Sequence, residues 1–312
     1  MANTFLTPSV IAQQALATLY ESTIMLPLVY TDLSQEFATA KIGDTVNVRK
    51  PAVFEAKLFN RGTGIEVQNA TEESIPVVLN RIPDVSFTVT DEDMSLDIDD
   101  FDTQLLSPAI EAIAQHVDIA IIQALQAGVT QEAGTHADAA TLGQTWDKPE
   151  VLIEAGRLLD TRSVPVTDRF AVAGVTTKAR WLNTDLLKHA EKSGSTEALR
   201  QGSLGRELFG FEAYRTANIA QPNPAGAGDP TTEVSLAFHR TALAFASAPL
   251  EIPAGANQGQ VAVANFRGLS MRVAYGWDIK YKQTTISVDM LYGTKVLDAN
   301  RAVLLKGADA ES

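Results

Sequence analysis

One long amphipathic helix, predicted for residues 102–128, constrains this chain more than any other part of its sequence. Ser107 followed by Pro108 is typical of a helix start. Gly128 is a typical stop, because glycine readily takes the left-handed conformation that closes a helix. At 1.5 Å per residue the helix would be about 30 Å long, roughly the width of a small domain. Apolar side chains at steps of three and four residues form the predicted buried face, which consists of Leu106, Ile110, Ile113, Val117, Ile121 and Leu125.

The opposite face of this helix carries polar side chains. Glu111, Gln115 and Asp118 are expected to face solvent or a neighbouring chain. A long rod of this kind suits a structural spine better than a catalytic pocket, so we expect the rest of the chain to pack around it.

Three strands are predicted before this helix, at residues 45–49, 75–79 and 85–90, because their side chains alternate in polarity. The first two are separated by about 25 largely polar residues, with a turn signal at residues 62–64, whereas most connections have about four to six. A hairpin that projects away from its own core explains such a long excursion. Because a two-stranded ribbon needs something to pack on, we expect its partner to be another subunit.

An acidic segment, residues 91–102, separates the last of these strands from the helix. A calcium-binding loop is one interpretation, but Leu96 stands where such a loop needs glycine, and the distal glutamate is missing. We therefore interpret the segment as a solvated lead-in whose last carboxylates suit the positive N-terminus of the helix. Its acidic residues are Asp91, Glu92, Asp93, Asp97, Asp99, Asp100 and Asp102.

A mixed α/β unit is predicted after the helix. Residues 149–159 form an amphipathic helix, residues 169–173 a short apolar strand, and residues 176–189 a further helix. The segment 221–230 is rich in proline and glycine and is expected to be an exposed loop.

Strand patterns return near the C-terminus. Residues 286–292 alternate, Gly293 is expected to break the strand, and residues 302–305 form a last apolar run before a polar tail. Sheet-forming segments therefore lie at both ends of the chain, with the α/β unit between them.

Composition narrows the classes of function. Lys plus Arg total 25 against 38 Asp plus Glu, a net charge of −13, which disfavours sequence-specific binding to nucleic acid. The absence of cysteine excludes disulfides, thiolate zinc sites and thiol catalysis. No apolar run approaches the roughly 18 residues needed to span a bilayer, and the start of the sequence does not resemble a secretory signal, so a cytosolic protein is expected.

No catalytic, cofactor-binding or metal-binding site is predicted. The glycines at 202–205 and 226–228 fit neither a nucleophile elbow nor a dinucleotide loop, and no phosphate-binding loop is present. The histidines stand alone, without a second histidine at metal-ligand spacing, and are interpreted as structural or surface residues: His116, His136, His189 and His239.

An ordered set of segments resembles the major capsid proteins of tailed bacteriophages with the Hong Kong 97-type shell fold, and is most similar to those of long-tailed actinobacterial phages. The match runs in order over nearly the whole chain. The segments that carry it are the opening 1–20, the excursion 43–68, the helix 107–125, the glycine-punctuated stretch 202–219 and the ending 286–307.

The resemblance implies an α+β fold built from an arm, an extended loop and two domains. The long helix would be the spine of the peripheral domain, and loops of the axial domain would meet around the capsomer axes. The implied ranges are an N-terminal arm at 1–40, an extended β-hairpin loop at 41–80, a peripheral domain at 81–140 and 270–307, an axial domain at 141–269 and a tail at 308–312.

The resemblance also implies a structural role without a cofactor, a membrane or enzymatic activity. Such a protein assembles in the host bacterial cytoplasm into the hexamers and pentamers of an icosahedral virion shell around double-stranded DNA, which it binds without sequence specificity. Its partners are copies of itself, a scaffolding protein, a portal and, in some relatives, decoration proteins. A scaffold separate from this chain, or none, is expected, because the sequence starts directly at the arm.

The residues that the resemblance assigns to the subunit interface lie in the extended loop. They are Lys57, Phe59, Arg61, Gly62 and Gly64. Some relatives cross-link such a lysine to an asparagine, and Lys57 and Asn300 occupy similar regions here, although the surrounding sequence matches poorly.

Two alternatives remain at this point. One is the shell of an encapsulin-like nanocompartment, which encloses cargo enzymes, and the other is a soluble hydrolase or transferase with an unrecognised site. Large hollow particles would exclude the soluble enzyme, and packaged nucleic acid would separate a phage shell from a nanocompartment.

Overall fold

A computed structural model describes most of the chain. The described residues are 23–31, 45–50, 61–62, 73–90, 107–135, 144–188, 207–224, 226–252, 261–266 and 269–310. The expected acidic lead-in and the first 22 residues of the arm lie outside these ranges.

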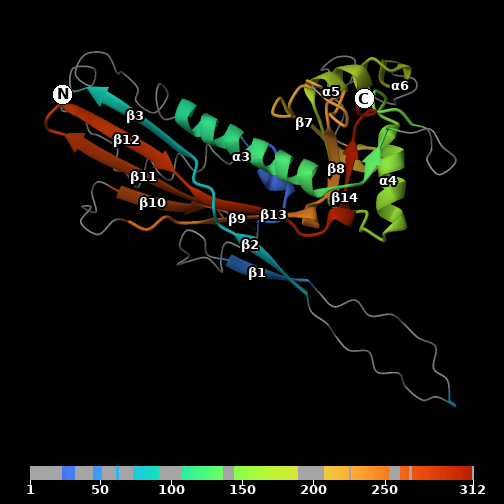
Figure 1. The fold of residues 1–312 in the computed structure, drawn as a ribbon, viewed down its shortest axis with the longest axis horizontal. Coiled ribbons are helices and arrows are strands. Elements are labelled where there is room, and N and C mark those ends of the chain that lie inside the picture. Colours follow the sequence, from blue (N-terminus) through green and yellow to red (C-terminus); the bar gives the residue numbers. More distant parts are fainter. Residues whose placement is uncertain are drawn as a thin grey trace.

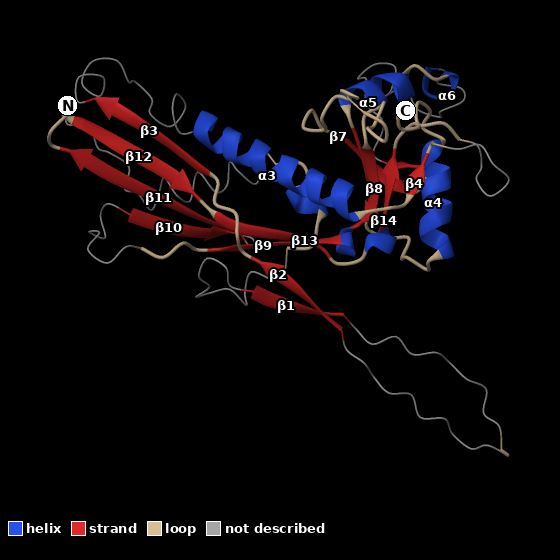
Figure 2. Cartoon of the chain, in the orientation of Figure 1, coloured by secondary structure: helices blue, strands red, loops and turns tan. Residues whose placement is uncertain are grey.

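The secondary structure combines helices with antiparallel and mixed sheets (Figures 1 and 2). None of the helices described is both long and apolar enough to cross a membrane. The helical elements are η1 (Leu26–Leu28), α3 (Ser107–Gly128), α4 (Val151–Thr161), α5 (Val175–Leu182), α6 (Asp185–Lys188), η4 (Arg240–Ala242) and η5 (Ala299–Arg301). The strands are β1 (Thr45–Lys50), β2 (Glu73–Val78), β3 (Asp84–Thr90), β4 (Glu132–Ala133), β5 (Arg169–Ala173), β6 (Glu207–Leu208), β7 (Phe211–Arg215), β8 (Ser235–His239), β9 (Leu243–Ala248), β10 (Val261–Phe266), β11 (Leu269–Asp278), β12 (Gln283–Asp289), β13 (Leu291–Val296) and β14 (Ala302–Leu305).

The predicted spine helix is present as α3. The predicted buried face is confirmed from Ile110 onward, while Leu106 lies outside the described residues. The helix ends at Gly128, as predicted. The left-handed conformation predicted for this glycine is wrong, because its φ is not positive. A Cβ on Gly128 would lie 2.6 Å from Cγ2 of Val296, so glycine is needed there for the close approach of β13.

An antiparallel four-stranded sheet, in the order β10-β11-β12-β3, lies along one side of α3 (Figure 1). Its inner face, with residues such as Val89, Ile286 and Val288, joins the buried face of α3 in one apolar cluster. In this sheet β3, which precedes the helix in the sequence, pairs with β12 from the last quarter of the chain. Sheet-forming segments were expected at both ends of the chain.

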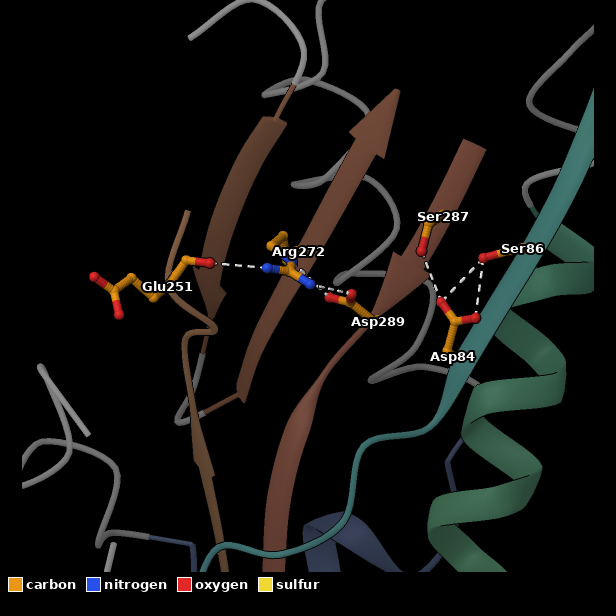
Figure 3. A network of polar contacts seen from close by, with 6 residues as sticks. All are labelled: Asp84, Ser86, Glu251, Arg272, Ser287 and Asp289. Carbon is orange, nitrogen blue, oxygen red and sulfur yellow. Dashed lines mark hydrogen bonds and ion pairs between the residues drawn. The ribbon is translucent and has the colours of Figure 1, made fainter. Parts of the chain in front are cut away.

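The outer face of this sheet is polar (Figure 3). Arg272 on β11 forms a two-pronged ion pair with Asp289 on β12, with N–O distances of 3.0 and 2.6 Å, and the two residues face each other in the register. Beside this pair, the Asp84 carboxylate accepts hydrogen bonds from the hydroxyls of Ser287 (2.7 Å) and Ser86 (3.0 Å). These contacts join three strands on the side away from α3.

A mixed six-stranded sheet, in the order β4-β14-β8-β5-β7-β6, occupies the other end of the molecule. One face packs against α4 in a cluster that includes Leu152, Phe211 and Trp181, and the other contributes Phe238 and Val172 to the cluster around α3. The expected order of helix, strand and helix is present as α4, β5 and α5. The single helix expected at 176–189 is divided, because α5 ends at Leu182 and α6 begins at Asp185.

Some strands pair across the ranges predicted for the two domains. β10 lies in the range expected for the axial domain, yet it pairs with β11 of the four-stranded sheet. β14 lies in the range expected for the peripheral domain, yet it pairs with β8, which lies in the range expected for the axial domain. The division into domains stays a prediction.

The C-terminal residues are tied to the proline- and glycine-rich loop. Backbone hydrogen bonds of 2.9 Å join Gly228 to Ala310 and Ala310 to Asp229. The nearby Lys306 is buried and pairs with Glu132 and Asp309 at 2.8 Å. Burial lowers the pKa of Lys306, but its hydrogen bonds to the two carboxylates outweigh this effect and raise the pKa above its usual value. The loop is exposed, as expected, and it also holds the chain end.

Candidate assembly surface

The β1–β2 hairpin extends away from both sheets (Figure 1). Its strands are antiparallel, with Thr45 opposite Val78 and Lys50 opposite Glu73. This pairing confirms the two strands predicted around the long excursion. Among the described strands, β1 and β2 pair only with one another, so each presents an outer edge to which a strand of another chain could bind.

The predicted interface residues fall mostly outside the described ranges. Arg61 and Gly62 lie in a turn and are exposed, which suits a contact surface. Lys57, Phe59 and Gly64 are outside the described residues. The interface assignment therefore stays a prediction, and so does the cross-link, for which Asn300 is exposed and placed in η5.

The root of the hairpin is anchored through one face of β2 and the residues just after it. Val77 and Leu79 are fully buried in a cluster with Leu291 of β13 and alanines of β9. Backbone hydrogen bonds of 3.1 and 3.0 Å then join Arg81 and Tyr292. The described part of the hairpin is thus fixed at its base.

Gly293 permits this anchoring and does not break a strand, so that prediction is wrong. It lies inside β13, and the chain leaves the four-stranded sheet three residues earlier, at Met290. A Cβ on Gly293 would overlap the carbonyl oxygen of Val78. The sequence requires glycine here because β2 crosses directly over β13.

Asp118 fixes residues 24 and 25, which lie within the range predicted for the N-terminal arm. We expected it to face solvent or a neighbour, and this is wrong: Asp118 is 2% exposed. Its carboxylate accepts hydrogen bonds from the backbone N–H groups of Ile24 (2.9 Å) and Met25 (3.1 Å). The physical reason is that these amides lie in a buried segment and need an acceptor that the apolar side chains around them cannot supply. Glu111 and Gln115 are exposed, as expected.

The environment of Asp118 affects its ionisation in two directions. Burial raises its pKa above the usual range, whereas hydrogen bonds from Ile24, Met25 and Asn218 act against this. Asn218 follows β7 of the six-stranded sheet, and its Nδ2 lies 3.5 Å from the carboxylate. One buried side chain therefore joins the spine helix, the root of the arm and the far sheet.

A second buried carboxylate, Glu233, holds the start of α5. It accepts hydrogen bonds from the N–H groups of Thr176 (2.9 Å) and Thr177 (2.8 Å), and Gln221 donates to it as well. Burial opposes its ionisation, but these hydrogen bonds together hold the pKa of Glu233 below its usual value. A Cβ on Gly174 would overlap the carboxylate, so glycine precedes the helix. No local pattern points to Glu233, because the two amides that it accepts from, those of Thr176 and Thr177, are more than fifty residues away in the sequence.

The described residues offer no arrangement that points to catalysis. Within them no group of His, Cys, Asp and Glu side chains could hold a metal ion. A polar pocket of about 380 Å³ beside α5 mixes acids with bases, among them Glu150, Asp185 and Arg180. His239 is buried, and its ring forms a hydrogen bond with the hydroxyl of Thr241, which agrees with a structural role.

The chain is similar in structure to chains of known proteins. No protein-family model matches the chain, and no match was found among curated proteins. A solved chain of Mycobacterium phage Che8 superimposes with a TM-score of 0.66 at 18% identity, over 97% of this chain and 93% of that one. A chain of the capsid of the cyanophage P-SCSP1u gives 0.59 at 14% identity, over 99% and 91%. A chain of a virus-like particle from Pyrococcus furiosus gives 0.53 at 13% identity, over 95% and 98%.

These similarities establish the fold. The chain has the α+β fold of phage capsid chains along nearly its whole length, which confirms the fold expected from the resemblance to Hong Kong 97-type proteins. The long helix, the projecting hairpin and the two sheets described above are therefore parts of a fold that builds shells in other proteins.

Proposed function

We propose that this chain is the major capsid protein of a tailed phage and assembles with copies of itself into a closed shell. The observation that carries the proposal is the match to phage capsid chains over almost the full length of both partners. The hairpin adds a physical reason, because its open edges and exposed turn are incomplete in a single chain.

The detailed form of the proposal follows the family that the sequence resembles. The subunits form hexamers and pentamers of an icosahedral shell around double-stranded DNA, with a portal and a scaffolding protein as partners and decoration proteins as a further class. The hairpin, including Lys57, Phe59, Arg61, Gly62 and Gly64, lies across a neighbouring subunit. The arm at 1–40, the peripheral domain around α3 and the axial domain around the six-stranded sheet keep the roles that the resemblance implies.

Electron microscopy of the purified full-length protein tests this proposal. We expect hollow, closed particles of uniform size. A protein that stays a monomer or dimer under all assembly conditions would overturn the proposal. Deleting residues 62–64 should leave a folded subunit that no longer forms stable particles.

A nanocompartment shell is the second candidate, because the virus-like particle from Pyrococcus furiosus shares the fold. Particles isolated with their contents separate the two. Double-stranded DNA protected from nuclease inside the particles supports the phage shell, whereas an enclosed enzyme and no DNA supports the nanocompartment.

A further inference from the structure

The turn between β6 and β7 holds a phenylalanine in an unfavourable conformation. Phe209 has a φ of 52° and Gly210 a φ of 81°, so the two form a tight hairpin turn with both residues in the left-handed region. Such turns favour asparagine followed by glycine, and a bulky side chain in this region is an outlier. Phe209 is also 40% exposed. A strained, exposed aromatic residue is a reason to look for a function.

The strands beside this turn add a second unfavourable feature. Glu207 faces Glu212 directly in the register, and like charges in such positions repel. Glu212 accepts a hydrogen bond from the Tyr214 hydroxyl at 3.0 Å, which holds its carboxylate in place. We call Glu207, Phe209 and Glu212 the acidic knob. Conflicts with local rules that gather at one place are expected where a surface serves another purpose than folding.

The other end of β7 carries the opposite charge. Arg215 ends the strand opposite Ala173, and α5 begins two residues after Ala173 with Val175, whose side chain is 53% exposed. Lys178 lies one turn further along α5. Neither Lys178 nor Arg215 has an ion pair with a carboxylate in the part of the chain that the structure describes. Burial and the positive charge of Arg215 lower the pKa of Lys178. We call Val175, Lys178 and Arg215 the basic end.

We propose that the acidic knob of one copy of this chain packs against the basic end of the next copy. Phe209 would cover Val175, and Glu207 and Glu212 would pair with Arg215 and Lys178. The two patches differ and lie at opposite ends of one five-residue strand, about 15 Å apart. Different patches that complement each other give a head-to-tail contact, which forms a ring when the rotation between neighbouring copies closes. This inference rests on the proposed shell function and names a contact within its rings.

Cysteine cross-linking tests the contact, because the chain contains no cysteine of its own. Assembled particles of Phe209→Cys/Val175→Cys, treated with a short thiol-specific cross-linker, should give a ladder of linked chains up to the size of one ring. Each single variant should give only monomer on a denaturing gel. Phe209→Cys/Val166→Cys is the matched control. Val166 is 73% exposed and precedes β5 of the same six-stranded sheet, but it lies outside the basic end. The absence of a ladder in the first variant, or an equal ladder in the control, would overturn the proposal.

Charge reversal gives an independent test. Glu207→Lys and Arg215→Glu should each lower the yield of closed particles by roughly tenfold, because each places like charges in the contact. The double variant should restore most of the yield, since it exchanges the partners. The pairing would be contradicted if neither single variant lowered the yield of closed particles. It would also be contradicted if the yield of the double variant were as low as the yields of the single variants.

Phe209→Asn separates a contact role from a folding role. Asparagine suits the left-handed turn, so the free subunit should melt roughly 2 °C higher. Particle yield should nevertheless fall, because the aromatic ring is gone. A variant that is both more stable and fully competent in assembly would overturn the proposal, and so would one that loses stability in the free subunit.

The outcome for the unmodified protein distinguishes this inference from the proposed function. If the unmodified chain forms no particles, the shell function fails and this contact fails with it. If it forms particles in which the two cysteines are never linked, only this contact is overturned.

Discussion

The six-stranded sheet and the β1–β2 hairpin differ in how far a single chain completes them. In the sheet, every residue of β5, β8 and β14 is buried, with α4 on one face and the cluster around α3 on the other. In the hairpin, Val77 is buried at the root, whereas Ser74, Pro76 and Val78 on the other face of β2 are exposed. One region is buried by the chain itself, and the other keeps exposed surface among the described residues.

The largest loss of stability is expected in the core of the six-stranded sheet. Phe238→Ala removes a fully buried ring and should lower the free energy of unfolding by about 4 kcal/mol. Val78→Ala in the hairpin, where the side chain is 39% exposed, is the matched change and should cost less than about 0.5 kcal/mol. Urea unfolding of the free subunit measures both, and similar losses would remove the contrast between the two regions.

Removing the Glu233 carboxylate should have the next largest effect. Glu233→Ala leaves the N–H groups of Thr176 and Thr177 without their acceptor, and should cost about 3 kcal/mol at pH 7. Because the folded-state pKa of Glu233 is below its unfolded value near 4.5, its stabilisation is present above that pH and is lost as the pH falls through the folded-state pKa. Glu233→Gln should therefore flatten the fall in stability below about pH 4.5. An unchanged acid profile would contradict this role.

Replacing Asp118 should loosen the root of the arm while leaving the sheet intact. Asp118→Asn keeps one acceptor and points a donor at a backbone N–H group, so we expect a loss of about 2 kcal/mol. Limited proteolysis should then cut near residues 23–31 faster. Gln115→Ala, on the exposed face of the same helix, is the control and should leave the cleavage rate unchanged.

The smallest effect on the free subunit is expected from shortening the hairpin. Deletion of residues 62–64 should change the free energy of unfolding by less than about 0.5 kcal/mol, because the described turn is exposed. The same deletion should abolish stable particles. Deletion of residues 222–224, in another exposed loop, should leave assembly intact, and a loss of particles in that control would show that assembly is sensitive to any shortened loop.

Local periodicity predicted the elements but not the polar groups buried among them. The face of α3 from Ile110 to Leu125 followed from the helical repeat. Asp118 was assigned to the outside because it is charged, although it lies four residues after Ala114 and four before Ile122, both buried. That spacing was a usable signal. Its partners, the amides of residues 24 and 25, are more than ninety residues away, so no local pattern could supply them.

Strand pairing and the roles of two glycines also depend on contacts between residues far apart in the sequence, which local patterns do not show. Alternation predicted strands at 45–49, 75–79 and 85–90, which are present as β1, β2 and β3, yet it could not show that β10 pairs with β11 and that β14 pairs with β8. Gly128 and Gly293 were interpreted as a stop and a break, because local rules assign glycine to turns. The helix does end at Gly128, whereas Gly293 lies inside a strand, and both glycines allow close contact with a segment remote in sequence, which is a property of the packed chain.

Hydrogen–deuterium exchange, compared between free subunits and assembled particles, tests most directly whether a neighbour completes the hairpin. The backbone amides on the outer edges of β1 and β2, which do not bond across the hairpin, should exchange rapidly in the free subunit and become strongly protected in particles, while those of β5 and β8 should be protected in both. A hairpin that is equally protected in the two states, or one that stays unprotected after assembly, would contradict the account.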